Sequence, residues 1–278
     1  MPPSPQQPVG IFDSGIGGLT VLDAIRQILP HEDYIYLGDT ARVPYGNRTP
    51  QTIIRYATSC ARQLVARNVK TIVIACNTAS AHAIDALRQT FDIPVLGVIT
   101  PASQLATHTT HSGHIGVIGT RATIQSHSYE RAIQTINPNT HVHSLPCPLL
   151  VPLVEEGWAN SQVAQLVVQQ YMEQLFNNTY EHADLIDTLI LGCTHYPVLK
   201  PLIHDVLTSM HKHVALCDSG TATANQLKQQ LFTSHLLNPQ TSTGNANYLV
   251  TDDPELFTAI GKSFMKSPPD TATHIDIS

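Results

Sequence analysis

The chain alternates between short apolar runs and longer segments in which apolar residues recur at helical spacing. The runs, each followed by a glycine or a polar turn, are Val9–Phe12, Tyr34–Leu37, Thr71–Ala75, Val95–Val98, Ile115–Ile118, Thr188–Leu191 and Val214–Cys217. Helical spacing relates two sets of apolar residues, Ile53, Ala57, Cys60 and Leu64, and Val163, Leu166, Val167 and Tyr171. Each set predicts a helix with one face on the core. Short buried strands that alternate with such helices predict a parallel α/β sheet.

Two segments share a local plan. The run that ends at Ala75 leads into Cys76-Asn77-Thr78, and the run that ends at Gly192 leads into Cys193-Thr194-His195. Each cysteine thus follows a predicted strand, at the edge where open α/β sheets bind their ligands. A weaker match relates Asp13-Ser14-Gly15 to Asp218-Ser219-Gly220. These similarities suggest two related halves, although matches of three residues also arise by chance.

The five cysteines of the chain divide into two groups. Cys60, Cys147 and Cys217 have no polar turn of this kind, and we expect them to fill the core as small apolar side chains. A thiol at a helix N-terminus, as expected for Cys76 and Cys193, is favoured as the reactive thiolate. A hydrolase or transferase needs one nucleophile and an oriented base. Two equivalent thiols instead suit a reaction that removes a proton from one face and returns one to the other, which is racemisation or epimerisation.

A glycine-rich turn, Asp13-Ser14-Gly15-Ile16-Gly17-Gly18, follows the first strand and precedes a helix. Its amides are suited to a carboxylate at the helix start, and it lacks the glycine spacing of a dinucleotide site. A tight structural turn is the alternative interpretation of the glycines. We expect Asp13 to assist Cys76, and His195 or an acid to assist Cys193.

Composition narrows the function. The 278 residues are enough for two modest domains, and a net charge of -6 provides no basic stripe for nucleic acid. No segment is long and apolar enough to span a membrane, and Met1 to Pro8 resembles a loose tail rather than a signal peptide. We therefore expect a cytoplasmic protein with free thiols. The 15 histidines are interpreted as solvated surface residues, because their short spacings lack the second ligand pair of a zinc site.

Six ordered segments resemble the bacterial glutamate racemases over nearly the whole chain. They are Val9–Thr20, Asp39–Gly46, Ala75–Thr78, Val151–Gly157, Gly192–Pro197 and, near the end, Thr251–Glu255 with Phe257. The resemblance implies interconversion of L- and D-glutamate without pyridoxal phosphate, metal or nucleotide. It also implies a role in supplying D-glutamate for peptidoglycan.

The resemblance assigns a role to single residues. Cys76 would take the proton from D-glutamate with the help of Asp13, and Cys193 would take it from L-glutamate with the help of Glu155 and His195. Composition alone does not distinguish Glu155 from Glu156. Substrate would be bound by Ser14, Asn77, Thr78 and Thr194, by the backbone of Pro44, Tyr45 and Gly46 and, on a looser match, by Thr120 and Thr123.

The family fold implies two similar lobes, each a mostly parallel sheet flanked by helices, with the active site in the cleft between them. We place lobe A at residues 1–99 and 211–278, and lobe B at residues 100–210. Homodimers are common in the family. Two alternatives stay open: a related cofactor-independent racemase that acts on aspartate or another small acid, and a non-catalytic relative, such as a regulator of DNA gyrase.

Overall fold

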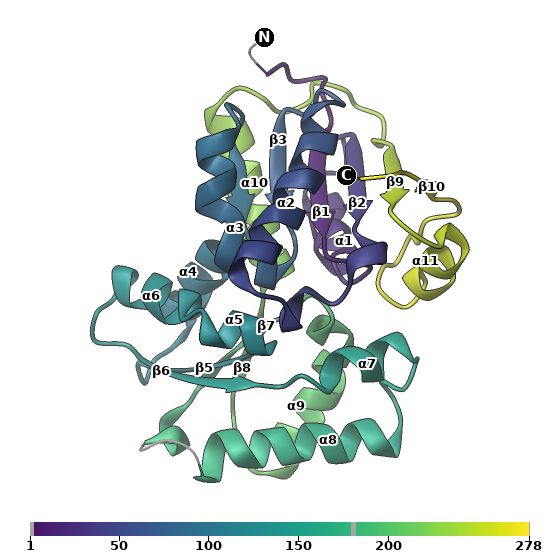
Figure 1. Ribbon diagram of the computed structural model, residues 1–278. Helices are drawn as coiled ribbons and strands as arrows, with labels where there is room; N and C mark the ends of the chain where they lie inside the picture. Colours follow the sequence, from purple (N-terminus) through teal and green to yellow (C-terminus); the bar gives the residue numbers. More distant parts are fainter. Residues whose placement is uncertain (1–2, 179–181, 278) are drawn as a thin grey trace. The chain divides into compact units, whose positions relative to one another are not determined.

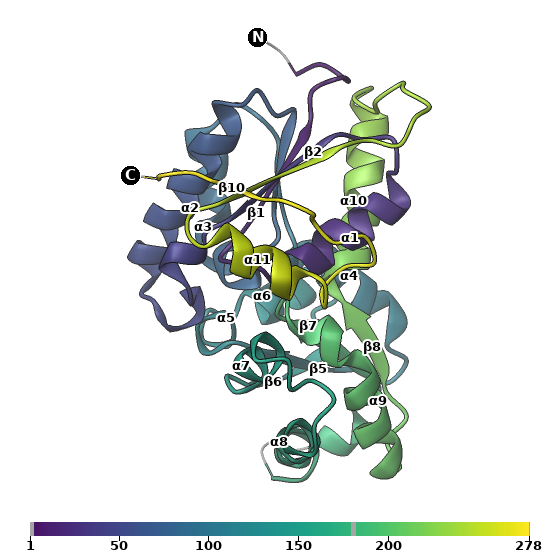
Figure 2. The same cartoon turned by 90° about the vertical axis from the view of Figure 1, so that its right-hand side faces the viewer.

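The computed structural model describes residues 3–178 and 182–277 and divides the chain into two compact units. Unit 1 comprises Met1–Val98 and Gly220–Ser278, and unit 2 comprises Ile99–Ser219. Each unit contains a parallel sheet with helices on its faces (Figures 1 and 2). The fold class expected from the sequence is therefore confirmed.

The sheet of unit 1 has six strands in the order β10-β9-β2-β1-β3-β4. The strands are β1 (Val9–Asp13), β2 (Tyr34–Gly38), β3 (Thr71–Ile74), β4 (Val95–Gly97), β9 (Ala246–Val250) and β10 (Thr273–His274). All neighbours pair in parallel. The end of the chain thus completes the sheet that its beginning starts, because β9 pairs with β2.

Helices α2 and α3 cover one face of this sheet, and α1 and α10 cover the other (Figure 2). The helices of unit 1 are α1 (Leu19–Ile28), α2 (Pro50–Val65), α3 (Asn77–Thr90), α10 (Ser219–Thr233) and α11 (Pro254–Gly261), with short 3-10 turns η1 (Thr40–Arg42) and η2 (Tyr45–Asn47). Helix α2 begins where the Thr49 side chain accepts a hydrogen bond from the Thr52 backbone N–H. Its predicted core face, which includes Ile53 and Leu64, is buried as expected.

The sheet of unit 2 has four strands in the order β6-β5-β7-β8. They are β5 (His114–Gly119), β6 (His141–Pro146), β7 (Thr188–Gly192) and β8 (Ala215–Asp218). The helices are α4 (Ile99–Thr109), α5 (Arg121–Gln125), α6 (Ser128–Ile136), α7 (Leu150–Glu155), α8 (Gln162–Glu173) and α9 (Lys200–Ser209), with short turns η3 (Gln174–Asn178), η4 (Ala183–Leu185) and η5 (Tyr196–Leu199). None of the helices described in either unit is long and apolar enough to cross a membrane.

The predicted core face of α8 is wrong. Val163 is 46% exposed and Leu166 is 67% exposed, whereas Ala164, Val168 and Met172 are buried. The helix has apolar residues on more than one face, so spacing alone did not identify the one that contacts the core. Burial selected the stripe with the four-residue period of Ala164, Val168 and Met172.

The two sheets repeat one strand order. The order β2-β1-β3-β4 in unit 1 corresponds to β6-β5-β7-β8 in unit 2, so β3 and β7 occupy equivalent places. The two cysteines that follow these strands are therefore equivalent in topology. The weaker sequence match does not share this equivalence, because Asp13 ends β1 whereas Asp218 ends β8, the counterpart of β4.

The boundaries of the units follow from strand pairing. The first division falls between Val98 and Ile99, one residue before the boundary that we expected after residue 99. The second falls between Ser219 and Gly220 rather than after residue 210, because β8 pairs with β7 and keeps its residues in unit 2.

A buried lysine anchors the N-terminal segment, which was expected to be loose. The Lys70 ammonium donates hydrogen bonds to the Pro5 carbonyl at 2.6 Å, to the Leu236 carbonyl at 2.9 Å and to the Glu32 carboxylate. The other carboxylate oxygen of Glu32 accepts from the Asn238 backbone N–H at 2.8 Å. Lys70 is fully buried, so its charge requires these partners.

The sequence predicted solvated surface histidines, but some of the histidines lie inside the protein. His114 and His143 are 8% and 5% exposed, and His114 Nδ1 lies 3.0 Å from His143 Nε2. The ring of His141 stacks on His114 with centroids 4.7 Å apart, because β5 and β6 pair these two residues. Within the described residues, no group of three or more His, Cys, Asp or Glu side chains is arranged to hold a metal ion.

Burial of this histidine cluster favours its neutral forms. Burial, with repulsion from His114 and His141, lowers the pKa of His143 to about 4. Burial also lowers the pKa of His114, together with repulsion from His141 and His182 and against the attraction of Asp184 and Asp187.

We expect Lys70→Met to lower the free energy of unfolding by about 3–5 kcal/mol, because it leaves the buried Glu32 carboxylate without its cation. Lys200→Met is the matched control, since Lys200 is half-exposed and lies 3.1 Å from Asp218; its cost should stay below about 1 kcal/mol. Urea unfolding followed by circular dichroism measures both. Equal small losses would show that the Lys70 cluster adds no stability.

Stability should fall at mildly acidic pH. The native pKa of His143 lies below the unfolded value of 6.5, so the unfolded state binds a proton at a higher pH than the native state. The free energy of unfolding is therefore highest above pH 6.5 and decreases as the pH falls toward 4. We expect the wild type to lose about 1–3 kcal/mol more than His143→Gln between these limits. His204→Gln, at an exposed position, is the control. Urea unfolding at several pH values should give it the same change of unfolding free energy with pH as the wild type. The same change with pH in His143→Gln as in the wild type would contradict the assignment.

Candidate functional site

Cys76 lies where β3 ends and α3 begins. Its Sγ accepts a hydrogen bond from the Ala79 backbone N–H at 3.4 Å and so caps the helix. The side chain is 5% exposed, and its Sγ lies 3.5 Å from Ser14 Oγ. The positive end of the α3 dipole therefore points at this sulfur, which stabilises negative charge there.

Asp13 lies beside Cys76 because β1 and β3 are parallel neighbours. The carboxylate is fully buried and accepts a hydrogen bond from the Gly15 backbone N–H at 3.0 Å. The turn after it requires a glycine, since a Cβ at Gly18 would lie 2.5 Å from the Cβ of Asp13. One turn therefore contains both a glycine that close packing requires and the approach to the carboxylate that lies beside Cys76.

Tyr36 supports the same turn and was missed in the sequence. Its hydroxyl donates to the Gly15 carbonyl at 2.9 Å, and its side chain is fully buried. Burial, with the negative charges of Asp13 and Cys76, raises the pKa of Tyr36 well above its usual value. Since Tyr36 lies in an apolar strand, its sequence context is that of an ordinary core tyrosine.

The segment that contains Pro44, Tyr45 and Gly46 is held by a buried carboxylate. Asp39 accepts hydrogen bonds from the Tyr45 hydroxyl, from Arg42 Nε at 2.8 and 2.9 Å, and from Thr251 Oγ1 at 3.0 Å. The Tyr45 side chain is buried and points to Asp39, and binding of substrate by the backbone of this segment stays a prediction. Asp39 and Thr251 were not predicted as site residues, although both belong to segments that carried the family resemblance.

The remaining predicted residues of unit 1 form the first turn of α3. Asn77 and Thr78 follow Cys76 directly and are buried. Backbone N–H groups of a first turn lack helical partners and bind anions. Unit 1 therefore brings together Asp13, Ser14, Cys76, Asn77 and Thr78 at the carboxyl edge of its sheet.

In unit 2, Cys193 follows β7 and is the first member of a three-residue chain of contacts. Its Sγ lies 3.9 Å from His195 Nδ1, and His195 Nε2 lies 2.9 Å from Glu155 Oε1. Cys193 and His195 are both buried, while Glu155 is partly exposed at the end of α7. A thiol, an imidazole and a carboxylate in this order are suited to proton transfer at the sulfur.

The imidazole of this chain is positively charged at neutral pH. Burial lowers the pKa of His195, but the hydrogen bonds to Cys193 and Glu155 and their charges outweigh this effect and raise it to about 10. Burial and the charge of Cys193 raise the pKa of the Tyr129 and Tyr196 phenols, which stay neutral. His195 therefore places a positive charge beside the Cys193 sulfur.

The structure distinguishes Glu155 from Glu156. Glu155 reaches His195, whereas Glu156 follows the end of α7 and is exposed. The difference arises because α7 ends at Glu155 and turns the next side chain to solvent. Composition could not show this, since it depends on where the helix stops.

The threonines of unit 2 lie around Cys193. Thr120 caps α5 and its Oγ1 lies 3.0 Å from Thr123 Oγ1. Because Gly119 of β5 pairs with Gly192 of β7, Thr120 follows its strand beside Cys193. Thr194 Oγ1 lies 3.4 Å from His195 Nδ1. The looser match of Thr120 and Thr123 thus leads to the same sheet edge as the cysteine.

The other three cysteines are buried, as predicted for core residues. Cys60 Sγ lies 3.9 Å from the Tyr45 hydroxyl, and Cys217 Sγ lies 4.0 Å from Thr109 Oγ1. All five cysteines belong to the described part of the chain, and no disulfide joins any of them. Cys147 also follows a strand, β6, but its Sγ contacts a backbone carbonyl, that of Leu145 at 3.7 Å. Cys76 and Cys193 instead lie beside polar side chains, Ser14 and His195.

Comparison with known proteins identifies the family. Residues 17–227 match the Asp/Glu/Hydantoin racemases. A glutamate racemase of Geobacter metallireducens is 48% identical over 261 residues, which cover 94% of this chain and 93% of that protein. The crystal structure of a Francisella tularensis glutamate racemase, in complex with D-glutamate, is 38% identical with a TM-score of 0.88 and covers 98% of both chains.

More distant structures share the fold alone. An aspartate racemase of Picrophilus torridus has a TM-score of 0.56 at 18% identity and covers 84% of this chain and 99% of that one. The resemblance seen in the sequence and the racemase activity that it implied are confirmed by the nearer relatives. The chain belongs to the Asp/Glu/Hydantoin racemase family and shares its fold and its racemase activity with the glutamate racemases.

Proposed function

We propose that the protein interconverts L- and D-glutamate by proton transfer between two thiols, without a cofactor. The observation that carries the mechanism is the topological equivalence of β3 and β7, each of which is followed by a buried cysteine with acidic or basic helpers. One thiolate breaks the Cα–H bond and becomes a thiol. The opposite thiol gives its proton to the other face of the planar carbanion and becomes the thiolate.

The two helper sets differ in chemistry, and this supports different roles for the two cysteines. Asp13 brings a buried carboxyl group to Cys76, whereas His195 brings a positive charge to Cys193. We assign Cys76 to the proton of D-glutamate with Asp13, and Cys193 to that of L-glutamate with His195 and Glu155. Negative charge that develops on Cys193 is stabilised by the imidazolium, which Glu155 holds in place.

Substrate recognition is assigned to groups at the same sheet edges. Glutamate has two carboxylates and an ammonium, so it needs several hydrogen-bond donors. We propose Ser14, Asn77, Thr78, Thr120, Thr123 and Thr194, with the backbone of Pro44, Tyr45 and Gly46. The support is their position beside Cys76 or Cys193 at strand ends and helix N-termini. The two-thiol mechanism requires that one glutamate molecule be within reach of both Cys76 and Cys193.

The cellular role is also a proposal. We infer that the enzyme supplies D-glutamate for peptidoglycan in the cytoplasm and acts as a homodimer, as the resemblance implies. The absence of disulfides among its five cysteines agrees with a reducing compartment. Glutamate is preferred to aspartate because the relatives with extensive identity are glutamate racemases, while the aspartate racemase shares the fold alone. Loss of optical rotation with each amino acid distinguishes these substrates, and turnover of either excludes a purely regulatory relative.

Each cysteine should be required for racemisation, but each single variant should still exchange the α-proton of one glutamate enantiomer with solvent. In deuterium oxide, the wild type should incorporate α-deuterium as it racemises glutamate. Cys76→Ser and Cys193→Ser should each racemise at least about 100-fold more slowly, because one proton donor is lost. Exchange without inversion should persist for L-glutamate in Cys76→Ser and for D-glutamate in Cys193→Ser.

NMR and circular dichroism of the recovered glutamate measure both quantities. Cys217→Ser is the control, since this buried thiol lies at the end of β8 beside Thr109, and it should retain most of the activity. Racemisation at the wild-type rate by either of the first two variants would falsify the two-thiol mechanism.

The helpers should affect opposite proton-transfer steps. Because the enantiomers have equal free energy, kcat/KM must fall equally in both directions, and the asymmetry should appear in kinetic isotope effects. With α-deuterated substrates, Asp13→Asn should raise the isotope effect for D-glutamate, and His195→Asn should raise it for L-glutamate. Glu155→Gln should resemble His195→Asn in a weaker form. Equal changes for both enantiomers would remove these residues from their assigned steps.

A further inference from the structure

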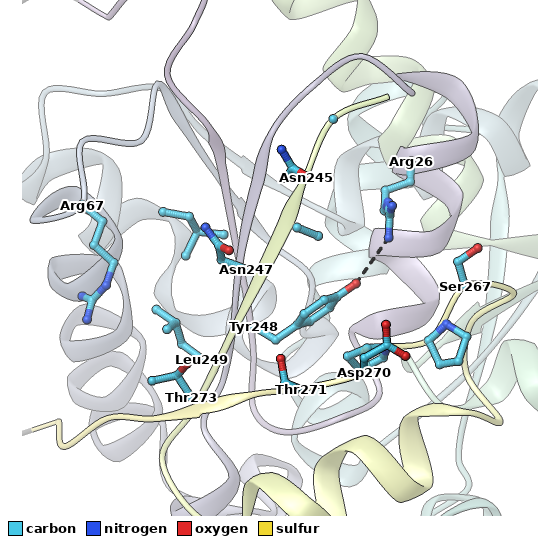
Figure 3. Close-up of a pocket in the computed structure, with 15 residues that line it drawn as sticks. Arg26, Arg67, Asn245, Asn247, Tyr248, Leu249, Ser267, Asp270, Thr271 and Thr273 are labelled. Atoms are coloured by element: carbon cyan, nitrogen blue, oxygen red, sulfur yellow. Dashed lines mark hydrogen bonds between the residues drawn. The ribbon is translucent and has the colours of Figure 1, made fainter. Parts of the chain in front are cut away.

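A hollow of about 680 Å³ lies in unit 1 beside β9 (Figure 3). It is bounded by β9, by the segment Ser267–Thr273 that precedes and enters β10, and by side chains from α1 and from the end of α2. None of the residues proposed for racemisation lines it. Its volume is typical of a ligand site, so its chemistry can be considered separately from the two cysteines.

One edge of β9 is open in this hollow. The Asn245 carbonyl accepts from Tyr34 of β2, and the Val250 carbonyl accepts from Ile275 on the other side. Backbone groups alternate in direction along a strand, so those of Ala246 and Tyr248 face the same side as Val250. Strand β10 pairs only with Leu249 and Val250. In the described part of the chain, no strand therefore covers this edge at Ala246.

Two guanidinium groups flank the open edge. Arg26 and Arg67 extend from opposite sides of β9 in Figure 3, and among the described residues neither forms an ion pair within 4.0 Å. Arg26 Nη1 donates to the Tyr248 hydroxyl at 3.4 Å. The hollow also contains one carboxylate, that of Asp270.

The amide side chains of Asn245 and Asn247 add hydrogen-bonding groups to this surface. Both are exposed, lie two positions apart along the chain and line the hollow. Successive side chains of a strand alternate between its faces, so these two share one face and Tyr248 lies on the other. A ligand along the edge would therefore meet amides on one side and an arginine-bound tyrosine on the other.

We propose that this hollow binds a short, extended, carboxylate-bearing peptide, which adds a strand to the open edge of β9. The peptide backbone pairs with the N–H and C=O of Ala246 and with the N–H of Tyr248, as in other cases of β-strand addition. Its carboxylates bind Arg26 and Arg67. At about 3.3 Å per residue, the edge from Ala246 to Tyr248 accommodates roughly three to four peptide residues.

The charge pattern favours a peptide over a simple anion. A small polyanion gains from the two arginines but is repelled by Asp270 and makes no use of the strand edge. A peptide can place its carboxylates at the arginines and direct its amide N–H groups toward Asp270 and the Ala246 carbonyl. The inference does not depend on racemase activity, because no proposed catalytic residue takes part.

Binding is tested with a fluorescein-labelled, C-terminally amidated peptide of alternating valine and glutamate. Fluorescence anisotropy should show saturable binding to the wild-type protein, with a Kd below about 1 mM. The same peptide with N-methyl groups on alternate amides cannot pair as a strand and should bind at least about tenfold more weakly. Equal binding of the two peptides, or no saturation by the first, would overturn the proposal.

Substitutions at the edge separate backbone pairing from side-chain contacts. Ala246→Pro removes an N–H that faces the open edge and leaves the bonds to β2 in place, as proline requires on an edge strand. It should abolish binding, whereas Ala246→Val, which keeps the N–H, should retain it. Arg67→Gln and Arg26→Gln should each weaken binding about tenfold.

Competition distinguishes the peptide from its charge alone. Unlabelled peptide should displace the probe, while citrate and free glutamate at the same concentration should not. Displacement by citrate to the same extent, or full binding by Ala246→Pro, would show that the hollow is not a strand-addition site.

Discussion

Parallel pairing of β1 with β3, and of β5 with β7, decides which side chains meet in this protein. Parallel strands end at the same edge of a sheet, so residues that follow neighbouring strands become neighbours themselves. Asp13 and Cys76 are 63 positions apart in the chain but are adjacent at one such edge. Thr120 and Cys193 are related in the same way by the pairing of Gly119 with Gly192. The proposed chemistry of both units depends on this register.

Close packing keeps these edges in place. A Cβ at Gly192 would lie 2.7 Å from the Ile118 carbonyl, and one at Gly38 would lie 2.6 Å from the Gly15 carbonyl. The backbones that lead to the site therefore approach more closely than side chains would allow. Buried hydrogen bonds then fix the turns themselves, through Tyr36 at Gly15 and through Asp39 at Tyr45. Rigid strands and well-bonded turns keep each cysteine in a fixed place at the end of its strand, as the proposed proton transfer requires.

The sequence was most informative where local chemistry and position coincide. A cysteine directly after a buried run indicates a strand-end thiol, and this located Cys76 and Cys193 without knowledge of the fold. It was least informative where the outcome depends on tertiary contacts. The roles of Tyr36 and Asp39, the buried face of α8 and the burial of His114 each depend on a partner distant in sequence. Likewise, Glu155 differs from Glu156 because α7 ends at Glu155, which contacts His195, whereas Glu156 follows the helix and is exposed.

The return of the chain to β2 also sets the order in which the protein can be completed during synthesis. Strands β1 to β4 emerge first, all of unit 2 follows, and β9 is made only after residue 245. Until then the edge of β2 that β9 will cover remains unpaired, and the contact of Lys70 with Leu236 becomes possible only after all of unit 2 has been made. Unit 2 is contiguous, so all of its residues are present before β9 is made and pairs with β2. The discontinuous unit is therefore the one exposed to wrong edge-to-edge pairing on the ribosome.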